Sequence, residues 1–386
     1  MAMMRGPSSS WVAEFERRAQ ANCYPLRVIW ELTHQCNERC RHCYLAPVGR
    51  AELGTVPIMA TLDQLADCGV LFATFTGGEI LCRADFFEIA SHARKRRFAL
   101  KLLTNATLID SDVAQRIAEL DPTVVDVSLY STDPAIHDNI TRFPGSFERT
   151  VRGLENLVAR GVRTVMRSPL TKVNAHQYRD LIAFAGQLGS RFVFDPTLIP
   201  RTDGCCEQLF LRPEDQDVVD LLSLSLGELA SDDLASRPIS RDRNANTPLC
   251  GAGNNLFSID PYGNIHPCLM LRVSAGNVRE QDFRTVWDSS PLLAEIRQIR
   301  AGQHPCWHCP QFEGCQICMG WAMIECGDPF AVLPERCRIT KLCAAVQSRH
   351  RHLTGGGISA GPGVAHPNLL TERRNVNTHE QQERET

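Results

Sequence analysis

The sequence lacks a strong excess of charge of either sign. Its 386 residues include 41 Lys and Arg against 44 Asp and Glu, which gives a formal net charge of −3. The longest run of like charge is the basic segment 94–97. Proteins that bind nucleic acid carry a clustered basic surface, so we expect no nucleic-acid partner.

Long apolar runs are also lacking. None approaches the roughly 18 residues that a membrane-spanning helix needs. The first 20 residues, MAMMRGPSSSWVAEFERRAQ, carry charge where a secretory signal would have its apolar stretch. The sequence therefore predicts no membrane association and a cytoplasmic location.

Cysteine, in contrast, is abundant. The chain has 17 cysteines, and the segment 250–343 holds a dense group of them: Cys250, Cys268, Cys306, Cys309, Cys315, Cys318, Cys326, Cys337 and Cys343. In a chain without an export signal, such clusters are more often metal ligands than disulfides. The count alone does not choose the metal.

Up to about residue 200, short apolar runs alternate with amphipathic stretches. The runs predict strands at 26–32, 71–76, 98–104, 124–130, 163–170 and 191–199. The clearest helical patterns are 111–120, 146–160 and 174–188, with Ser111, Ser146 and Asn174 as expected N-caps and Gly161 and Gly189 as expected C-caps. This alternation indicates an α/β fold with a parallel sheet, whose chemistry gathers in the loops after the strands.

The pattern also predicts a division into domains. An N-terminal extension (1–25) precedes the strand–helix core (26–230), which includes a helix after Pro213. A linker (231–249) leads to a cysteine- and proline-rich unit (250–345), whose few apolar residues imply that metal or disulfides stabilise it. A disordered tail (346–386) is expected to follow.

The first group of cysteines lies directly after the first predicted strand. Cys36, Cys40 and Cys43 are separated by three and two residues in ELTHQCNERCRHCYL. Three thiolates can hold a four-iron cluster and leave one iron open to a small molecule. Zinc is the alternative, with His34 or His42 as the fourth ligand.

A second motif ends the next predicted strand. Gly77 and Gly78 let the backbone approach a ligand closely, and Glu79 can accept hydrogen bonds from an ammonium group. A Gly-Gly-Glu turn alone says little. Beside a loop of three cysteines at the same edge of a sheet, it becomes a strong signal.

Together these motifs resemble the radical S-adenosylmethionine superfamily over residues 26 to 200. The resemblance implies a partial (βα)6 TIM-like barrel with a small C-terminal iron–sulfur domain. It also implies that Cys36, Cys40 and Cys43 bind a [4Fe–4S] cluster whose open iron chelates S-adenosylmethionine. The motif Gly77, Gly78 and Glu79 would then hold the methionine amino group.

Three further residues match less distinctive positions of that family. Ser128 would contact the ribose of S-adenosylmethionine and Arg142 its carboxylate, and Asn105 would lie near the cofactor. From the residues alone, Ser128 could equally be a strand residue with a satisfied hydroxyl. Arg142 could be a surface charge and Asn105 a turn former.

The later cysteines admit two interpretations on spacing alone, structural zinc and iron–sulfur clusters. Their order resembles the SPASM extension of radical S-adenosylmethionine enzymes, except that two residues instead of three separate Cys315 from Cys318. The resemblance implies two auxiliary [4Fe–4S] clusters, with Cys306, Cys309, Cys315 and Cys337 on the distal one and Cys250, Cys268 and Cys318 on the nearer one. The nearer cluster then has either an open iron or a fourth ligand, Cys326 or Cys343.

Five cysteines lie outside both patterns: Cys23, Cys68, Cys82, Cys205 and Cys206. A free cysteine is usually a small buried hydrophobe. We therefore assign no ligand role to these five residues.

The resemblance implies an enzyme that cleaves S-adenosylmethionine reductively to a 5′-deoxyadenosyl radical and oxidatively modifies a peptide or protein. The expected partners are that substrate and an electron donor such as flavodoxin or ferredoxin. Because only about 25 residues precede the first strand, a separate protein is expected to bind any leader peptide. The alternatives are an enzyme acting on a haem-type tetrapyrrole and a zinc-stapled scaffold without catalytic activity.

Overall fold

The computed structural model describes residues 9–46, 49–227 and 244–353. The described residues up to Val346 form one compact unit, and those from Gln347 onward belong to a second. Most of the predicted linker, and the predicted tail beyond residue 353, lie outside the described residues. The predicted division into domains at 26–230 and 250–345 therefore stays a prediction.

Six parallel strands alternate with helices along the first part of the chain. They are β1 (Arg27–Thr33), β2 (Phe72–Gly77), β3 (Ala99–Thr104), β4 (Val124–Ser128), β5 (Thr164–Pro169) and β6 (Arg191–Asp195). Each strand pairs in parallel with the next in sequence. The fold is thus the open partial barrel that the sequence predicts.

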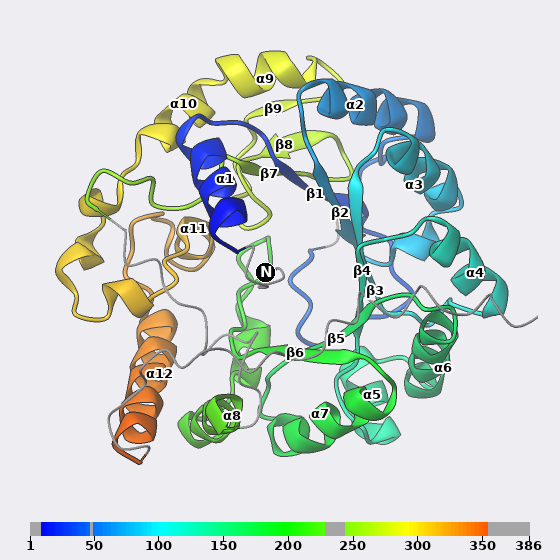
Figure 1. The fold of residues 1–386 in the computed structure, drawn as a ribbon, viewed down its shortest axis with the longest axis vertical. Coiled ribbons are helices and arrows are strands. Elements are labelled where there is room, and N and C mark those ends of the chain that lie inside the picture. The colour runs from blue at the N-terminus through cyan, green and yellow to red at the C-terminus, as the bar shows by residue number, and fades with distance from the viewer. Residues whose placement is uncertain (1–8, 47–48, 228–243, 354–386) are drawn as a thin grey trace, which may run out of the picture. The chain divides into compact units, whose positions relative to one another are not determined.

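Helices cover the outer face of this curved sheet (Figure 1). The helices of this part are α2 (Thr55–Asp67), α3 (Phe86–Lys95), α4 (Ser111–Glu119), α5 (Pro134–Thr141), α6 (Ser146–Val158) and α7 (Tyr178–Gln187). Alternate residues of β1, such as Trp30 and Leu32, are fully buried in one core with Leu62 and Leu65 of α2. The intervening residues of each strand lie on the opposite face of the sheet, away from the helices.

Two of the expected N-caps are wrong by one residue. The carboxylate of Asp110, and not Ser111, accepts the hydrogen bond from the Val113 N–H at the start of α4. Ser146 is the first residue of α6, and its hydroxyl donates to the Asp138 carboxylate at 2.8 Å. In both places a nearby carboxylate is the stronger acceptor.

The expected cap at Asn174 is also corrected. Asn174 precedes the 3-10 turn η2 (Ala175–Gln177), and α7 begins only at Tyr178. The Asn174 amide instead donates to the Tyr130 carbonyl at 2.9 Å, which ties two strand ends together. Gly161 and Gly189 follow their helices with φ of +70° and +67°, as their expected role in helix termination requires.

A second group of strands extends the same sheet beyond β1. They are β7 (Leu256–Ile259), β8 (Asn264–His266) and β9 (Gly276–Asn277). β7 pairs in parallel with β1, and β8 and β9 follow it antiparallel. β1 therefore has a partner strand on each side, one from the barrel and one from the cysteine-rich segment.

The remaining elements flank the barrel and the cysteine-rich segment. The helices are α1 (Ser9–Ala21), α8 (Asp215–Gly227), α9 (Phe283–Ser289), α10 (Pro291–Gln298), α11 (Met319–Cys326) and α12 (Pro334–Leu353). The other 3-10 turns are η1 (Ile80–Cys82), η3 (Glu207–Leu211), η4 (Ala301–Gln303), η5 (Pro305–His308) and η6 (Phe312–Gly314). The helix predicted after Pro213 is α8.

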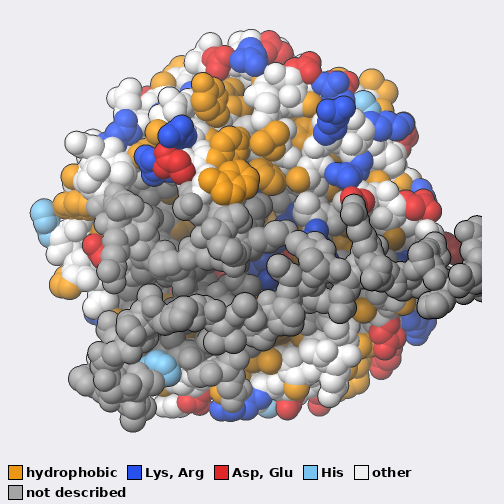
Figure 2. Space-filling view, viewed as in Figure 1, with side chains coloured by type: hydrophobic (Ala, Val, Ile, Leu, Met, Phe, Trp, Pro, Cys, Tyr) orange, Lys and Arg blue, Asp and Glu red, His pale blue; other side chains and the backbone are white. Residues whose placement is uncertain are grey.

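The face viewed in Figure 2 carries Lys, Arg, Asp and Glu side by side around its periphery, while hydrophobic side chains gather in its upper centre. Large exposed hydrophobic side chains of the described chain include Trp11 and Phe15 of α1. No helix among the described residues is long and apolar enough to cross a membrane.

Candidate functional site

The loop with the first three cysteines leaves the carboxyl end of β1 and is anchored on the end of α5. The backbone N–H of Arg39 donates to the Thr141 carbonyl and that of Arg41 to the Ile140 carbonyl, both at 2.9 Å. These backbone bonds fix the loop whatever side chains it carries. The loop therefore lies at the edge of the sheet where parallel barrels place their active sites.

The three thiols of this loop lie close enough together to influence one another electrostatically. Burial raises the pKa of Cys36 to about 12, with smaller contributions from Glu79, Glu38 and Cys82. Burial also raises the pKa of Cys40 well above its usual value, and Glu38, Cys43 and Cys36 raise it further. Thiolates crowded this way need cationic compensation, which an iron cluster supplies, so the donor set fits the predicted cluster.

Cys82, which the sequence analysis left outside the patterns, lies beside this loop. Burial raises the pKa of its thiol, Glu79 raises it further, and the backbone N–H of Asn37 lowers it by a hydrogen bond. Cys82 belongs to the turn η1 that directly follows the Gly-Gly-Glu motif. Its spacing in the sequence gave no signal of this proximity.

The Glu79 carboxylate is fully buried and accepts hydrogen bonds from three neighbouring residues. The Thr104 hydroxyl lies 2.8 and 2.9 Å from its two oxygens, and the backbone N–H groups of Asn105 and Leu81 donate at 2.7 and 3.0 Å. Burial raises the pKa of Glu79, and these hydrogen bonds lower it in part. The side chain thus joins the ends of β2 and β3.

The two glycines before Glu79 are required by close backbone packing. A Cβ on Gly77 would lie 2.1 Å from the Thr33 carbonyl oxygen, and one on Gly78 would lie 2.2 Å from the Gln35 oxygen. Gly77 also has φ of +135°, which L side chains rarely adopt. Any side chain here would push the cysteine loop away from the sheet.

Asn105 connects the end of β3 to the cysteine loop. Its amide nitrogen donates to the Asn37 side-chain oxygen at 2.8 Å and lies 4.0 Å from the Cys36 sulfur. Its own oxygen accepts from the Thr107 backbone N–H and hydroxyl. Asn105 is therefore both a turn former and a neighbour of the predicted cluster.

The end of β4 reaches the same loop through Tyr130. The Tyr130 hydroxyl lies 4.0 Å from the Cys40 sulfur. Burial raises the pKa of Tyr130 well above its usual value, and a hydrogen bond with the Ser128 side chain lowers it in part. Ser128 therefore lies beside Tyr130 at the edge of the site. The sequence analysis did not assign Tyr130 to the site, although Tyr130 ends the predicted strand 124–130.

Arg142 lies next to the anchor points of the cysteine loop. It follows Thr141 at the end of α5, with φ of 54°, and its side chain is exposed. A positive φ in a residue other than glycine is uncommon. The structure thus brings Arg142, Ser128, Asn105 and the Gly-Gly-Glu motif to the edge occupied by the cysteine loop.

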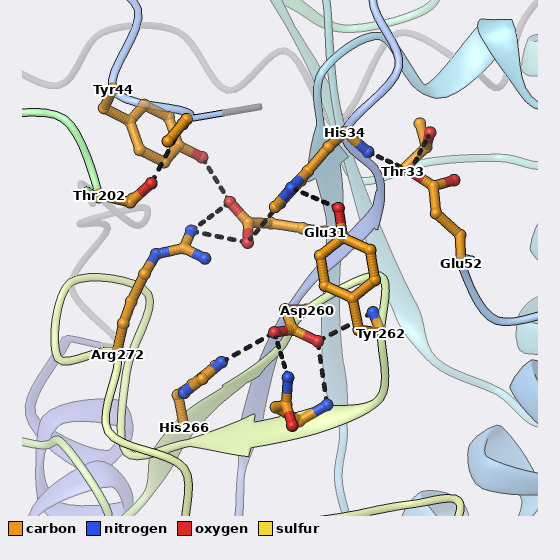
Figure 3. A network of polar contacts seen from close by, with 12 residues as sticks. Glu31, Thr33, His34, Tyr44, Glu52, Thr202, Asp260, Tyr262, His266 and Arg272 are labelled. Carbon is orange, nitrogen blue, oxygen red and sulfur yellow. Dashed lines mark hydrogen bonds and ion pairs between the residues drawn. The ribbon is translucent and has the colours of Figure 1, made fainter. Parts of the chain in front are cut away.

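A buried ion pair joins β1 to the cysteine-rich segment, and Tyr44 of the cysteine loop contacts the same pair (Figure 3). The Glu31 carboxylate, on β1 and 1% exposed, accepts from an Arg272 guanidinium nitrogen at 2.6 and 2.7 Å. The Tyr44 hydroxyl donates to the same carboxylate at 2.9 Å. Burial opposes the charge of Glu31, but His34 and Arg272 hold its pKa below the usual value.

His34 extends the network and does not turn toward the cysteines. Its ring nitrogens lie 3.4 Å from the Glu31 carboxylate and 3.3 Å from the Tyr262 hydroxyl. Beyond Tyr262, the Asp260 carboxylate lies 3.2 Å from the His266 ring (Figure 3). Both histidines therefore belong to a polar network that connects β1 with the β7–β8 hairpin.

The predicted nearer auxiliary set comes together in the structure. Burial raises the pKa of Cys268 to about 12, and the next contributions come from Cys250 and Cys318. A Cβ on Gly320 would lie 2.4 Å from the Met270 carbonyl carbon, so the start of α11 packs tightly on the segment after Cys268. Three segments distant in sequence therefore bring these thiols together.

The predicted distal set also comes together. Burial raises the pKa of Cys306, with further contributions from Cys337, Cys315 and Cys309. Cys326 is exposed at the end of α11, while burial raises the pKa of Cys343, an effect that Arg336 opposes only in part. In the described ranges, no three His, Cys, Asp or Glu side chains are arranged to hold a single metal ion.

Three charged residues on the inner face of the barrel escaped the sequence analysis. The Asp126 carboxylate of β4, 3% exposed, pairs with the Lys101 ammonium of β3 at 2.8 Å and with the Arg167 guanidinium of β5. The sequence feature that could have identified them is a charged residue within each of three predicted apolar strands. These residues make the interior polar on the face that the helices do not cover.

Comparisons with known proteins agree with this geometry. Residues 30–185 match the Radical SAM superfamily, and residues 250–310 match SPASM, an iron–sulfur cluster-binding domain. Mycofactocin maturase MftC of Mycobacterium tuberculosis (strain CDC 1551 / Oshkosh) is 31% identical over 81% of this chain and 82% of its own length. AdoMet-dependent heme synthase of Nitratidesulfovibrio vulgaris is 25% identical over 80% and 90%.

A solved structure shares the fold. Streptococcus suis SuiB bound to precursor peptide SuiA matches with a TM-score of 0.66 at 19% identity, covering 87% of this chain and 82% of SuiB. At that identity the likeness concerns the fold alone. The sequence matches and the assembled site together establish that this chain belongs to the radical S-adenosylmethionine superfamily, in the group with a SPASM iron–sulfur cluster-binding domain.

Proposed function

We propose that this enzyme is a peptide maturase that cleaves S-adenosylmethionine and oxidatively modifies a peptide. The observation that carries the proposal is the gathering of three separate thiol sets in one compact unit, one of them at the active-site edge of the barrel. The relative MftC, whose name describes a maturase, supports the peptide as substrate class. Membership of this enzyme family argues against the alternative of a non-catalytic scaffold protein stabilised by zinc.

Cys36, Cys40 and Cys43 hold the first [4Fe–4S] cluster in this proposal. When bound, the cluster and S-adenosylmethionine together supply the 5′-deoxyadenosyl radical that removes a hydrogen atom from the substrate. The loop's backbone bonds to α5 keep the three thiols in place without help from the cofactor.

The surrounding residues bind and orient the cofactor. Gly77, Gly78 and Glu79 form the site for the methionine amino group, with the buried Glu79 carboxylate holding that backbone in position. Ser128 contacts the ribose and Arg142 the cofactor carboxylate. Asn105 holds the cysteine loop against β3.

The later thiols bind two auxiliary clusters. Cys306, Cys309, Cys315 and Cys337 hold the distal cluster, and Cys250, Cys268 and Cys318 hold the nearer one. The fourth position of the nearer cluster stays either open or filled by Cys326 or Cys343. When bound there, such clusters would supply an acceptor for the electron that is released when the substrate is oxidised.

The remaining partners complete the proposal. A flavodoxin or ferredoxin supplies the electron, and a separate small protein presents any leader peptide. The cytoplasmic location stays a prediction from the sequence.

The test is anaerobic reconstitution with iron and sulfide, followed by dithionite, S-adenosylmethionine and a precursor peptide encoded beside the gene. We expect 5′-deoxyadenosine and methionine together with a peptide whose mass has decreased through oxidation. A variant with Cys36→Ala, Cys40→Ala and Cys43→Ala serves as control and should form none of these products.

Two results would count against the proposal. Equal 5′-deoxyadenosine from the triple variant would show that another site cleaves the cofactor. Cofactor cleavage that a haem-type tetrapyrrole stimulates, and peptides do not, would move the enzyme to the tetrapyrrole alternative.

A further inference from the structure

The loop after β6 carries two adjacent cysteines that belong to none of the three thiol sets. Cys205 is partly buried and Cys206 is exposed. The usual behaviour of a free cysteine, as a small buried hydrophobe, therefore does not hold at Cys206. Both thiols lie in the segment 201–206, directly before the turn η3. We call this segment the thiol-pair loop.

The thiol-pair loop lies directly on the end of the first cysteine loop. The Thr202 N–H donates to the Tyr44 carbonyl at 2.8 Å, and the Ala46 N–H donates to the Thr202 hydroxyl oxygen at 3.1 Å. Figure 3 shows Thr202 beside Tyr44. Arg201 lies close enough to Cys43 to act on that thiol electrostatically. The end of the cysteine loop is therefore held by the conformation of the thiol-pair loop.

The peptide unit between the two cysteines holds the thiol-pair loop in shape. Its carbonyl, that of Cys205, accepts a hydrogen bond from the Arg201 N–H at 2.9 Å. The Gly204 N–H donates to the Arg201 carbonyl at 2.8 Å, and the Cys206 thiol donates to the Gly204 carbonyl at 3.4 Å. These bonds close the turn from which Thr202 contacts the cysteine loop.

A disulfide between the two adjacent cysteines would distort this peptide unit. The Cα atoms of neighbouring residues lie about 3.8 Å apart across a trans peptide, closer than the usual range of about 4.4–6.8 Å in disulfides. The small ring that closes is therefore strained, and it turns the peptide unit that it contains. Turning that unit moves the Cys205 carbonyl away from the Arg201 N–H. Strained and exposed disulfides are also readily reduced again, as a reversible modification requires.

We propose that Cys205 and Cys206 form a redox modification site, whose disulfide loosens the end of the cysteine loop and weakens S-adenosylmethionine binding. The effect on S-adenosylmethionine rests on the proposed function. The oxidant is a small disulfide of the glutathione type. One thiolate attacks a sulfur of the oxidant and releases one thiol, and the second thiolate then displaces the other half. The cysteine pair loses two electrons and two protons, and the oxidant is reduced to two thiols.

The sequence allows this pair to be analysed separately from the other cysteines. Trypsin cleaves after Arg201 but not before proline, so it releases the fragment 202–241. The only cysteines of that fragment are Cys205 and Cys206. Its mass therefore distinguishes two free thiols, a disulfide and a glutathione adduct.

The experiment treats the full-length, cluster-loaded enzyme with oxidised glutathione in the absence of oxygen. Three quantities are measured before and after treatment: the mass of the fragment 202–241, hydrogen–deuterium exchange at 44–46, and S-adenosylmethionine affinity by equilibrium dialysis. The variants are Cys205→Ser, Cys206→Ser and Cys68→Ser. Cys68 is the matched control because it is a partly buried free thiol at the end of α2, outside the three sets.

In the wild type, the fragment should lose two hydrogen atoms, and exchange at 44–46 should become faster. The affinity for S-adenosylmethionine should fall by about tenfold, a typical size for coupling between two sites. Dithiothreitol should reverse all three changes. In Cys205→Ser and Cys206→Ser, exchange and affinity should not respond to the oxidant, because a single thiol cannot close the ring. Cys68→Ser should respond as the wild type does.

The proposal fails if the treated fragment keeps two thiols or retains glutathione in place of the disulfide. It also fails if the disulfide forms while exchange and affinity stay unchanged, because the pair then does not act on the cysteine loop. An equal response in Cys205→Ser would assign the effect to another thiol. If the reduced wild type binds no S-adenosylmethionine, the proposed function fails instead, and the fragment mass and the exchange at 44–46 still decide whether the pair acts as a switch.

Discussion

Glu79 illustrates how a single residue serves the site from a distance. Its carboxylate receives hydrogen bonds from Thr104, Asn105 and Leu81, and it is fully buried. An acceptor with two backbone N–H donors cannot be replaced by a group that itself donates. The geometry therefore requires a carboxylate, and we propose that its effect on the cofactor passes through the backbone of Gly77 and Gly78.

Glu79→Gln tests this role. The new amide NH2 must face at least one N–H donor, and leaving such a buried donor unsatisfied costs about 1–3 kcal/mol. We expect a lower free energy of unfolding in urea and weaker S-adenosylmethionine binding by equilibrium dialysis. Thr104→Val, which removes one donor and keeps the carboxylate, should affect both quantities less. Unchanged stability and affinity in Glu79→Gln would contradict this account.

Among the elements, β1 and the segment after β8 are linked by the Glu31–Arg272 pair. Breaking a buried pair by removing one partner is costly because the other charge stays buried without compensation. The Glu31 pKa is lowered in the folded protein. The stabilisation from the pair is therefore complete above the usual glutamate pKa of about 4.5 and is lost as the pH falls through the lower folded value.

Arg272→Met should lower the free energy of unfolding at pH 7 by about 3–5 kcal/mol. The double variant Arg272→Met with Glu31→Gln should recover most of that loss, because no uncompensated charge remains. Urea denaturation of the two variants and the wild type provides the measurement. If the double variant were as unstable as Arg272→Met, packing and not charge would explain the effect.

At the scale of the whole molecule, three thiol sets lie in one compact unit but come from different segments. The first set lies within a single loop, whereas the other two draw on residues 250 to 337. Because the sets share no cysteine, loss of one should leave the other two able to bind iron.

A variant with Cys250→Ala, Cys268→Ala and Cys318→Ala should keep about eight of the roughly twelve iron atoms that three four-iron clusters contain. It should still form 5′-deoxyadenosine but no modified peptide. Iron analysis and mass spectrometry of the products check this. Cys68→Ala, which removes a thiol outside the three sets, should retain all the iron, and an equal loss there would undermine the assignment.

Much of this architecture was predictable because its signals are local. Each strand of the barrel is a short apolar run, and parallel strands place their following loops at one edge. The cysteine loop, the Gly-Gly-Glu motif, Asn105 and Ser128 follow four successive strands or end them, so their shared location follows from the strand order. Their roles toward the cofactor stay proposals.

Contacts between distant segments were not predictable. β7 has four residues, and nothing in LFSI indicates that it pairs with β1. Arg272 meets Glu31 across 241 residues of sequence. Asn174 does not cap α7, because its side-chain oxygen accepts from Thr171 while its amide donates to the distant Tyr130 carbonyl. In each case the tertiary structure supplies a partner that local patterns do not contain.

The pairing of β1 on both sides has a consequence for exchanging modules between related enzymes. A cut between the barrel and the cysteine-rich segment would leave β1 with an unpaired edge, and such edges promote aggregation. A graft from a relative must therefore bring a strand that fits the register of Arg27 to Trp30 against Leu256 to Ile259. The barrel and the cysteine-rich segment can therefore be exchanged between enzymes only if the new β1 and β7 still pair with each other.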